Sequence, residues 1–131
     1  PEMSRGLGDV YKRQREVYPA VREADAVVLL CPNYNDALSA NLTAAINRLT
    51  ALYRTTSFAD KAVFAIVVSG YSGGDIVARQ VVSALNMNKG FWLPNRFCML
   101  ETANDKGEAM ALPGIEERAE KFAINMLRQL I

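Results

Sequence analysis

The stretch AVFAIVVSGYSGGDIV, residues 62–77, holds seven apolar residues, then a glycine-rich turn, then the start of a helical pattern. A short apolar run that is rich in β-branched residues and bounded by a turn indicates a strand buried on both faces. After the turn, a helix that opens at Asp75 would place its apolar residues on one side, and these are Val77, Val81, Ala84 and Leu85. The stretch therefore predicts a buried strand that leads directly into a helix.

The same alternation of strand and helix continues on both sides of this stretch. Residues 15–25 are typical of the end of a helix, residues 26–31 (AVVLLC) of a second strand covered on both faces, and residues 96–101 (RFCMLE) of a weaker third strand. Apolar residues at helical spacing predict two further helices that face the core: Leu42, Ala45, Ile46, Leu49, Leu52 and Tyr53, with Ser39 or Asn41 as N-cap, and Ile115, Ala119, Phe122, Ala123, Met126, Leu127 and Leu130. Such alternation predicts an α/β fold with a parallel sheet and helices on both faces.

Composition bounds the class of protein. The chain has 131 residues, half of them hydrophobic, which suits one domain with a core of its own. Its longest apolar run, residues 62–68, is too short to cross a bilayer, and the start of the chain lacks the apolar segment of a signal peptide. The net charge is +1 without a basic stripe, so we expect neither nucleic acid nor a membrane as partner. Cys31 and Cys98 have no CxxC partner, which favours two buried free thiols over a disulfide or a metal site.

The first fourteen residues differ from the rest. Residues 9–14, DVYKRQ, resemble the translation of a transposon-end adaptor used in preparing DNA sequencing libraries. We interpret residues 1–14 as a non-native or disordered leader and residues 15–131 as the domain, with a natural basic tail as the alternative. On this interpretation, the natural beginning of the protein lies upstream of the printed sequence.

Function is expected in two loops, because ligands of open parallel sheets bind beyond the carboxyl ends of the strands. These loops are CPNYNDALS (residues 31–39) and SGYSGGD (residues 69–75). The second has the Gly-x-Ser-x-Gly pattern of a serine hydrolase around Ser72, but the chain contains no histidine to act as base. We therefore nominate no catalytic residue.

The glycine-rich loop is also unlike a phosphate site. Gly73 and Gly74 precede a helix N-terminus, where free amides attract anions, but we expect Asp75 to cap that terminus and to repel a phosphate. Neither GxxxxGK[ST] nor GxGxxG is present. The loop suits a flat, neutral group that approaches the backbone closely, and Tyr34 and Tyr71 could cover an aromatic ring.

The segment READAVVLLCPNYNDALSANLTAAINRL, residues 22–49, resembles the flavodoxin-like NAD(P)H-dependent FMN reductases. The matching features are Ala24-Asp25, the apolar strand and Pro32-x-Tyr34-Asn35, whereas Cys31 stands where this family more often has Thr or Ser. The resemblance continues through the glycine-rich loop and the last helix, so it covers residues 15–131. It implies a flavodoxin-like three-layer α/β/α fold whose N-terminal strand–helix–strand, with the FMN phosphate loop, is missing from this chain.

The same resemblance implies a function and a set of site residues. FMN would be the cofactor, NAD(P)H the co-substrate, and a quinone, azo compound, metal ion or free flavin the electron acceptor. The flavin ring would be held by Pro32, Asn33, Tyr34, Asn35, Ser69, Gly70, Gly73 and Gly74, with Tyr71 and Ser72 as further candidates. A cytoplasmic homodimer is implied, with the helix after Ser39 and residues 102–114 near the partner and the flavin.

Two alternatives stay open. The parent protein could be a flavodoxin that only carries electrons, although such carriers are usually strongly acidic and this chain is not. The chain itself could bind FMN only weakly, because hydrogen bonds to the phosphate, each worth about 1.5–3 kcal/mol, would be lost with the upstream loop. Its first strand would also keep an unpaired edge, which favours aggregation or swapping.

Overall fold

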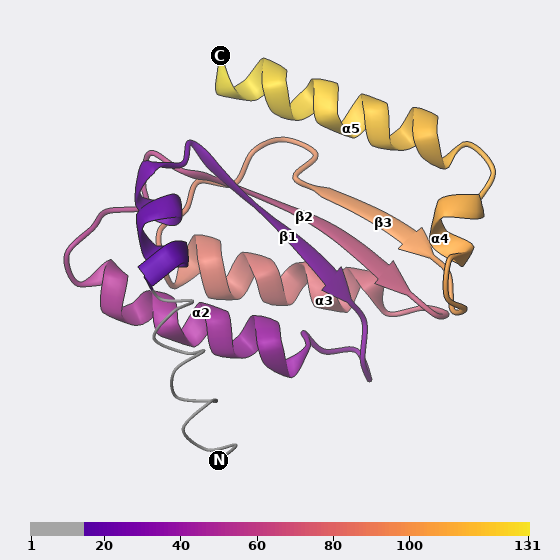
Figure 1. Cartoon of the computed structure of the whole chain (residues 1–131), viewed down its shortest axis with the longest axis horizontal. Helices are drawn as coiled ribbons and strands as arrows, with labels where there is room; N and C mark the ends of the chain where they lie inside the picture. The colour runs from indigo at the N-terminus through magenta and orange to yellow at the C-terminus, as the bar shows by residue number, and fades with distance from the viewer. Residues whose placement is uncertain (1–14) are drawn as a thin grey trace.

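The computed structural model describes residues 15–131, and Figure 1 shows their arrangement. A helix covers residues 15–23 and is followed by eight named elements. In chain order these are β1 (Ala26–Pro32), α2 (Ala40–Tyr53), β2 (Ala62–Ser69), α3 (Gly74–Val81), the π-helix η1 (Val82–Met87), β3 (Cys98–Thr102), α4 (Glu108–Ala111) and α5 (Ile115–Leu130). The predicted alternation of strands and helices is confirmed.

The three strands form one parallel sheet in the order β1-β2-β3. Ala26 lies opposite Ala62 at the start of the first pair, and Ala65 lies opposite Cys98 at the start of the second. The third strand begins two residues later than predicted, because Arg96 has a φ of 51°, outside the range of extended backbone. All three strands end at the same side of the molecule, so the loops that follow them are neighbours (Figure 1).

The main core lies between the sheet and the helices α2 and α3 with η1. Val77, Val81 and Leu85 are fully buried against this face, as the helical spacing predicts. Ile46, Leu49 and Leu52 of α2 are buried in the same cluster. Ser39 is the N-cap of α2, where its hydroxyl accepts a hydrogen bond from the backbone N–H of Leu42 at 3.2 Å.

The opposite face is covered mainly by α5, with the short α4 at one end, which gives the predicted three layers (Figure 1). Phe122 packs edge-on against Phe64 at a centroid distance of 6.0 Å, with Met126 and Leu130 partly buried beside it. The prediction that the whole apolar stripe of α5 is core is wrong. Only Phe122 is buried, while Leu127 is 61% exposed, because a single helix cannot enclose both its own stripe and the sheet face.

The prediction that β1 is covered on both faces is also wrong. Val28 is 42% and Leu30 is 67% exposed, and both lie on the face where α5 packs, because that helix sits over β2 and β3. Within residues 15–131, β1 is also an edge strand, since only β2 pairs with it. One face and one edge of β1 therefore remain open.

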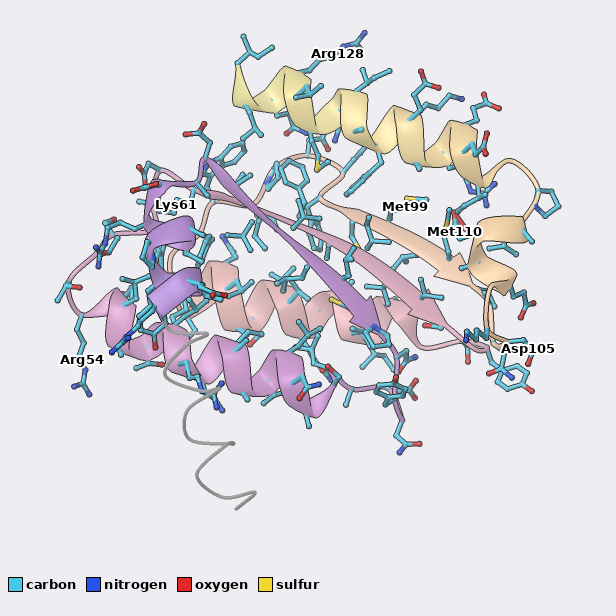
Figure 2. The ribbon with its side chains drawn as sticks, in the orientation of Figure 1. Arg54, Lys61, Met99, Asp105, Met110 and Arg128 are labelled. Carbon is cyan, nitrogen blue, oxygen red and sulfur yellow. The ribbon has the colours of Figure 1, made fainter. Side chains whose placement is uncertain are left out.

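A buried lysine fastens the helix of residues 15–23 to the start of the sheet. Lys61 is 4% exposed, and its Nζ donates to the carbonyl oxygens of Arg22 at 2.7 Å and of Ala24 at 3.0 Å. These are carbonyls at a helix C-terminus, which a positive charge stabilises. Figure 2 places Lys61 at the end of the sheet opposite to the strand-end loops. In the described part of the chain, no helix is long and apolar enough to span a bilayer.

Candidate functional site

A polar cleft lies where the loops after β1, β2 and β3 meet. Its volume is about 330 Å³, at the lower end of the range for small-molecule sites. The cleft is lined by Asn33, Asn35, Asp36, Gly70, Tyr71, Ser72 and Asn104. Its position at the carboxyl ends of parallel strands is the one that the fold predicts for a ligand.

The first wall of the cleft is a two-residue hairpin. The backbone N–H of Tyr34 donates to the carbonyl of Ala37 at 3.3 Å, and that of Ala37 donates back to Tyr34 at 3.1 Å. Asn35 and Asp36 between them have φ values of 55° and 57°, the left-handed conformation that a type I′ turn requires. Asn and Asp tolerate this conformation better than other residues with a side chain, which explains why they occupy the turn.

Asn33 joins this wall to the second. Its backbone N–H donates to the carbonyl of Val68 at 3.0 Å and extends the sheet by one bond. Its side-chain Nδ2 lies 3.1 Å from the Ser69 hydroxyl, 3.2 Å from the Ser72 carbonyl oxygen and 3.3 Å from Asp36 Oδ1. One amide group therefore holds both loops at a fixed separation. Its Oδ1 is buried and has no hydrogen-bond partner among the described residues.

Two glycines allow the loops to approach one another. A Cβ on Gly70 would lie 2.6 Å from Asn104 Oδ1 of the third loop, which is closer than a real contact. Gly73 has a φ of 93°, and a Cβ there would collide with the carboxylate of Asp36. These positions need glycine for space, and Gly73 needs it for its backbone conformation as well.

The structure brings the ten predicted site residues together around the cleft, where five line it and five lie next to it. Asn33, Asn35, Gly70, Tyr71 and Ser72 line the cleft. The other five support it from behind or beside it: Pro32, Tyr34, Ser69, Gly73 and Gly74. Tyr34 and Tyr71 are 62% and 83% exposed, so neither ring is packed into the core.

The prediction that Asp75 caps the helix after the glycines is wrong. The N-cap of α3 is Gly73, and no side chain makes a cap hydrogen bond there. Asp75 instead lies in the first turn, 64% exposed and 4.0 Å from Arg79. Because Gly73 in its left-handed conformation is the cap, two residues before the predicted one, Asp75 is the second residue of the helix and makes no cap hydrogen bond. Its negative charge still lies at the helix N-terminus, which disfavours an anion there.

Three site residues were missed by sequence reasoning: Asp36, Asn104 and Gln80. Asp36 and Asn104 line the cleft, and both follow strand ends, so the strand-end rule could have found them.

Glu108 secures the loop around Asn104 by accepting hydrogen bonds from the backbone N–H groups of Asn104 and Asp105, each at 2.8 Å. These bonds, that of Asp105 first, hold the pKa of the Glu108 carboxyl below its usual value.

The cleft contains no basic side chain, and its only charged lining residue is Asp36. It therefore does not suit a phosphate group, whereas amide and carbonyl groups from three loops suit a polar, uncharged ligand. In residues 15–131, no hydrogen bond links the Ser72 hydroxyl to a basic side chain, so the geometry of a serine nucleophile is not formed.

A second hollow lies between the sheet and the helices α4 and α5. Its volume is about 240 Å³, and Figure 2 shows Met99 and Met110 facing it from β3 and α4. The other lining residues are Ile66, Val68, Glu101, Ala109, Ile115, Glu116 and Ala119. Mostly apolar side chains line it, so it offers few hydrogen bonds to orient a polar ligand.

The fold and the position of the cleft define a flavodoxin-like α/β protein. Two solved structures support this class. Rubredoxin oxygen:oxidoreductase from the anaerobe Desulfovibrio gigas matches with a TM-score of 0.59 and 17% identity over 82% of this chain. The flavodiiron protein from Giardia intestinalis matches with a TM-score of 0.53 and 19% identity over 80% of this chain. The chain spans only 23% and 26% of the length of these two structures.

The sequence also matches the family model described as NADPH-dependent FMN reductase over residues 7–105, more than half of the chain. The chain therefore belongs to the NADPH-dependent FMN reductase family, a family of flavin-dependent oxidoreductases. The matched range begins within residues 1–14, which lie outside the described residues, and the leader stays a prediction. No curated protein matches the sequence.

Proposed function

We propose that this chain carries the ring-binding part of an FMN-dependent NAD(P)H oxidoreductase. The observation that carries the proposal is the pair of loops joined by Asn33, which form one polar cleft at the carboxyl ends of β1 and β2. Family membership supplies the cofactor class, and the cleft supplies a place that suits its ring.

The residues of the cleft fit the flat part of FMN. Gly70 and Ser72 line the cleft from the second loop, while Asn33, Asn35 and Asn104 add side-chain amides that can donate and accept. The buried and unpartnered Oδ1 of Asn33 would gain a donor if a small shift of the loop let the N–H edge of the ring approach. The cleft volume of about 330 Å³ holds a ring system rather than the whole of FMN.

Bound FMN would supply the redox chemistry, which is to accept hydride from NAD(P)H and to pass electrons to an acceptor. The protein would bind and orient the ring by main-chain groups of the two loops, with Tyr34 and Tyr71 limiting the access of water. No side chain is required to act as acid or base, so we assign no catalytic residue. The electron acceptor would be a small molecule.

The phosphate of FMN would need a different part of the protein, since no basic residue lines the cleft. As part of the proposal, residues upstream of the domain supply that phosphate site.

The parent protein would be a cytoplasmic homodimer, with α2 and residues 102–114 close to the second subunit and the flavin. Asn104 supports only the proximity of residues 102–114 to the flavin, because it follows β3 and lines the cleft.

The test is an FMN titration of the purified chain, followed by anaerobic addition of NADPH. We expect FMN fluorescence to change on binding, and the visible flavin absorbance to fall when NADPH is added. Asn33→Ala should weaken FMN binding, because it releases both loops. Asn125→Ala is the matched control: its Nδ2 donates to the carbonyl of Asn95 at 3.1 Å, far from the cleft.

Each outcome separates the candidates. Binding with bleaching by NADPH supports the reductase. Binding without bleaching, in a protein that a partner reductase does bleach, would favour an electron carrier. Binding that Asn33→Ala and Asn125→Ala weaken equally would show that the cleft is not the site.

A further inference from the structure

The hairpin wall of the cleft depends on one side chain from α3. Gln80 Nε2 donates to the carbonyl oxygen of Asp36 at 2.9 Å, and Gln80 Oε1 accepts from the backbone N–H of Leu38, also at 2.9 Å. Both ends of one amide therefore bind the backbone of the same loop. The partners are 44 and 42 positions away in sequence, so this contact is tertiary.

Glutamine meets two requirements at this position. The carbonyl of Asp36 needs a donor and the N–H of Leu38 needs an acceptor, and a carboxamide carries the two on separate atoms at the end of one side chain. No other hydrogen bond among the described residues uses either of these two backbone groups. Without Gln80, the turn that holds Asn35 and Asp36 in left-handed conformations would lose its only bonds to α3.

We propose that Gln80 is a positioning residue for the flavin ring. It holds the hairpin of residues 34–37 against α3, so that this wall keeps its distance from the loop of residues 70–73. Gln80 does not line the cleft, and it acts through Asp36 and Leu38. This inference rests on the proposed function, because the cleft must be the flavin site for its width to set flavin affinity.

Two substitutions separate hydrogen bonding from bulk. Gln80→Met keeps the length of the side chain and removes both bonds. Gln80→Glu keeps the acceptor for Leu38, but as a carboxylate it repels the carbonyl of Asp36, and when protonated it regains a donor. We expect each variant to raise the Kd for FMN about tenfold at pH 7.5.

The pH profile distinguishes positioning from a general loss of structure. As pH falls from 7.5 to 5, the ratio of the Gln80→Glu Kd to the wild-type Kd should fall, while the Gln80→Met ratio stays constant. The charged groups nearest in the chain, Asp36, Asp75 and Arg79, are common to all three proteins, and the Gln80→Met ratio shows whether their own titration changes the Kd. A flat Gln80→Glu ratio would overturn the proposal.

Gln129 offers a matched control. Its side-chain amide binds a loop backbone in the same way, donating to the carbonyl of Asn95 and accepting from its N–H, both at 2.7 Å, but on α5. Gln129→Met should lower the free energy of unfolding about as much as Gln80→Met without changing the Kd for FMN. An equal rise in Kd for both variants would show a non-specific effect and would overturn the proposal.

Amide hydrogen exchange without flavin gives an independent measurement. The Leu38 amide should be protected in the wild type and in Gln80→Glu, and unprotected in Gln80→Met. If the wild type fails to bind FMN, the proposed function fails, while Leu38 exchange still reports whether Gln80 holds the hairpin. Protection of Leu38 in Gln80→Met would contradict the inference directly.

Discussion

Asn33 and Gly73 determine how the two loops of the cleft meet. The side chain of Asn33 supplies the contact, with Nδ2 3.1 Å from the Ser69 hydroxyl and 3.2 Å from the Ser72 carbonyl oxygen. Gly73 supplies the space, because the carboxylate of Asp36 occupies the position where a Cβ would stand. A change at either residue should affect the cleft before it affects the core.

Gly73→Ala tests the requirement for space. Alanine in the left-handed conformation costs about 1–2 kcal/mol, and displacing Asp36 should cost about 1–3 kcal/mol more. Gly90→Ala is the control, because Gly90 has a similar φ of 84° and nothing within 4 Å of its Cβ position. Urea unfolding should show the larger loss for Gly73→Ala, and only this variant should weaken FMN binding. Equal losses for the two variants would contradict the close contact with Asp36.

The two thiols predict a dependence of stability on high pH. Burial raises the pKa of Cys31 to about 11, and burial with the charge of Cys31 raises the pKa of Cys98 to about 12. An unfolded thiol has a pKa of about 8.5, so the thiols contribute their full stabilisation below that pH and lose it as pH rises toward 11. The free energy of unfolding should fall more steeply between pH 8.5 and 11 in the wild type than in a Cys31→Ala/Cys98→Ala variant. Cys31 is buried as predicted, whereas Cys98 is only partly buried. Identical slopes would show that the pKa of neither thiol is raised in the folded protein.

At the scale of elements, local patterns predicted what local physics decides. The apolar runs at residues 26–31, 62–68 and 96–101, and the helical stripes that alternate with them, predicted a parallel sheet with helices in the observed chain order. The apolar helical stripe predicted an N-cap at Ser39 or Asn41, and the structure selects Ser39. These features depend on residues close together in sequence.

The errors at this scale have a common cause. The exposure of Leu30 and that of Leu127 depend on which elements pack over these residues, and not on the residues themselves. A continuous apolar strand reads as covered on both faces whether or not a second layer is present. In the same way, the sequence correctly placed the apolar residues of α5 on one side of the helix, but it wrongly predicted that all of them are buried.

The cleft was predictable in position but not in detail. Strand ends located the two loops, and the resemblance supplied their ten residues. Gln80 gave no signal, because a glutamine in the middle of a helix is normally a solvent-exposed residue. Its role requires knowledge that α3 passes beneath the hairpin, which only the tertiary structure provides.

At the scale of the whole molecule, the main irregularity in residues 15–131 is the edge of β1 that pairs with no other strand. The carbonyl of Asp25 accepts from Ala62, and the N–H of Asn33 donates to Val68. The N–H and C=O groups of the odd-numbered residues along β1 therefore face β2. The N–H groups of Ala26, Val28 and Leu30 therefore point to the free edge, beside two exposed apolar side chains. Edges of this kind favour pairing with another chain.

We therefore expect the purified chain to self-associate through β1. Leu30→Lys places a charge on this edge and should shift sedimentation velocity toward the monomer. Leu100→Lys is the control, since Leu100 is 50% exposed on the other edge strand, β3. A monomeric wild type, or an equal shift by both lysines, would show that β1 is not the contact.

The central claim is that the loops after β1 and β2 together hold a flavin ring. The most direct measurement is an FMN titration of the ¹⁵N-labelled chain, followed by amide chemical shifts, because it reports weak binding and its location at once. We predict that shifts concentrate in residues 33–36 and 70–74 and at Asn104, and leave the hollow around Met110 unchanged. Shifts confined to other residues, or no shift in either loop at saturating FMN, would contradict the account.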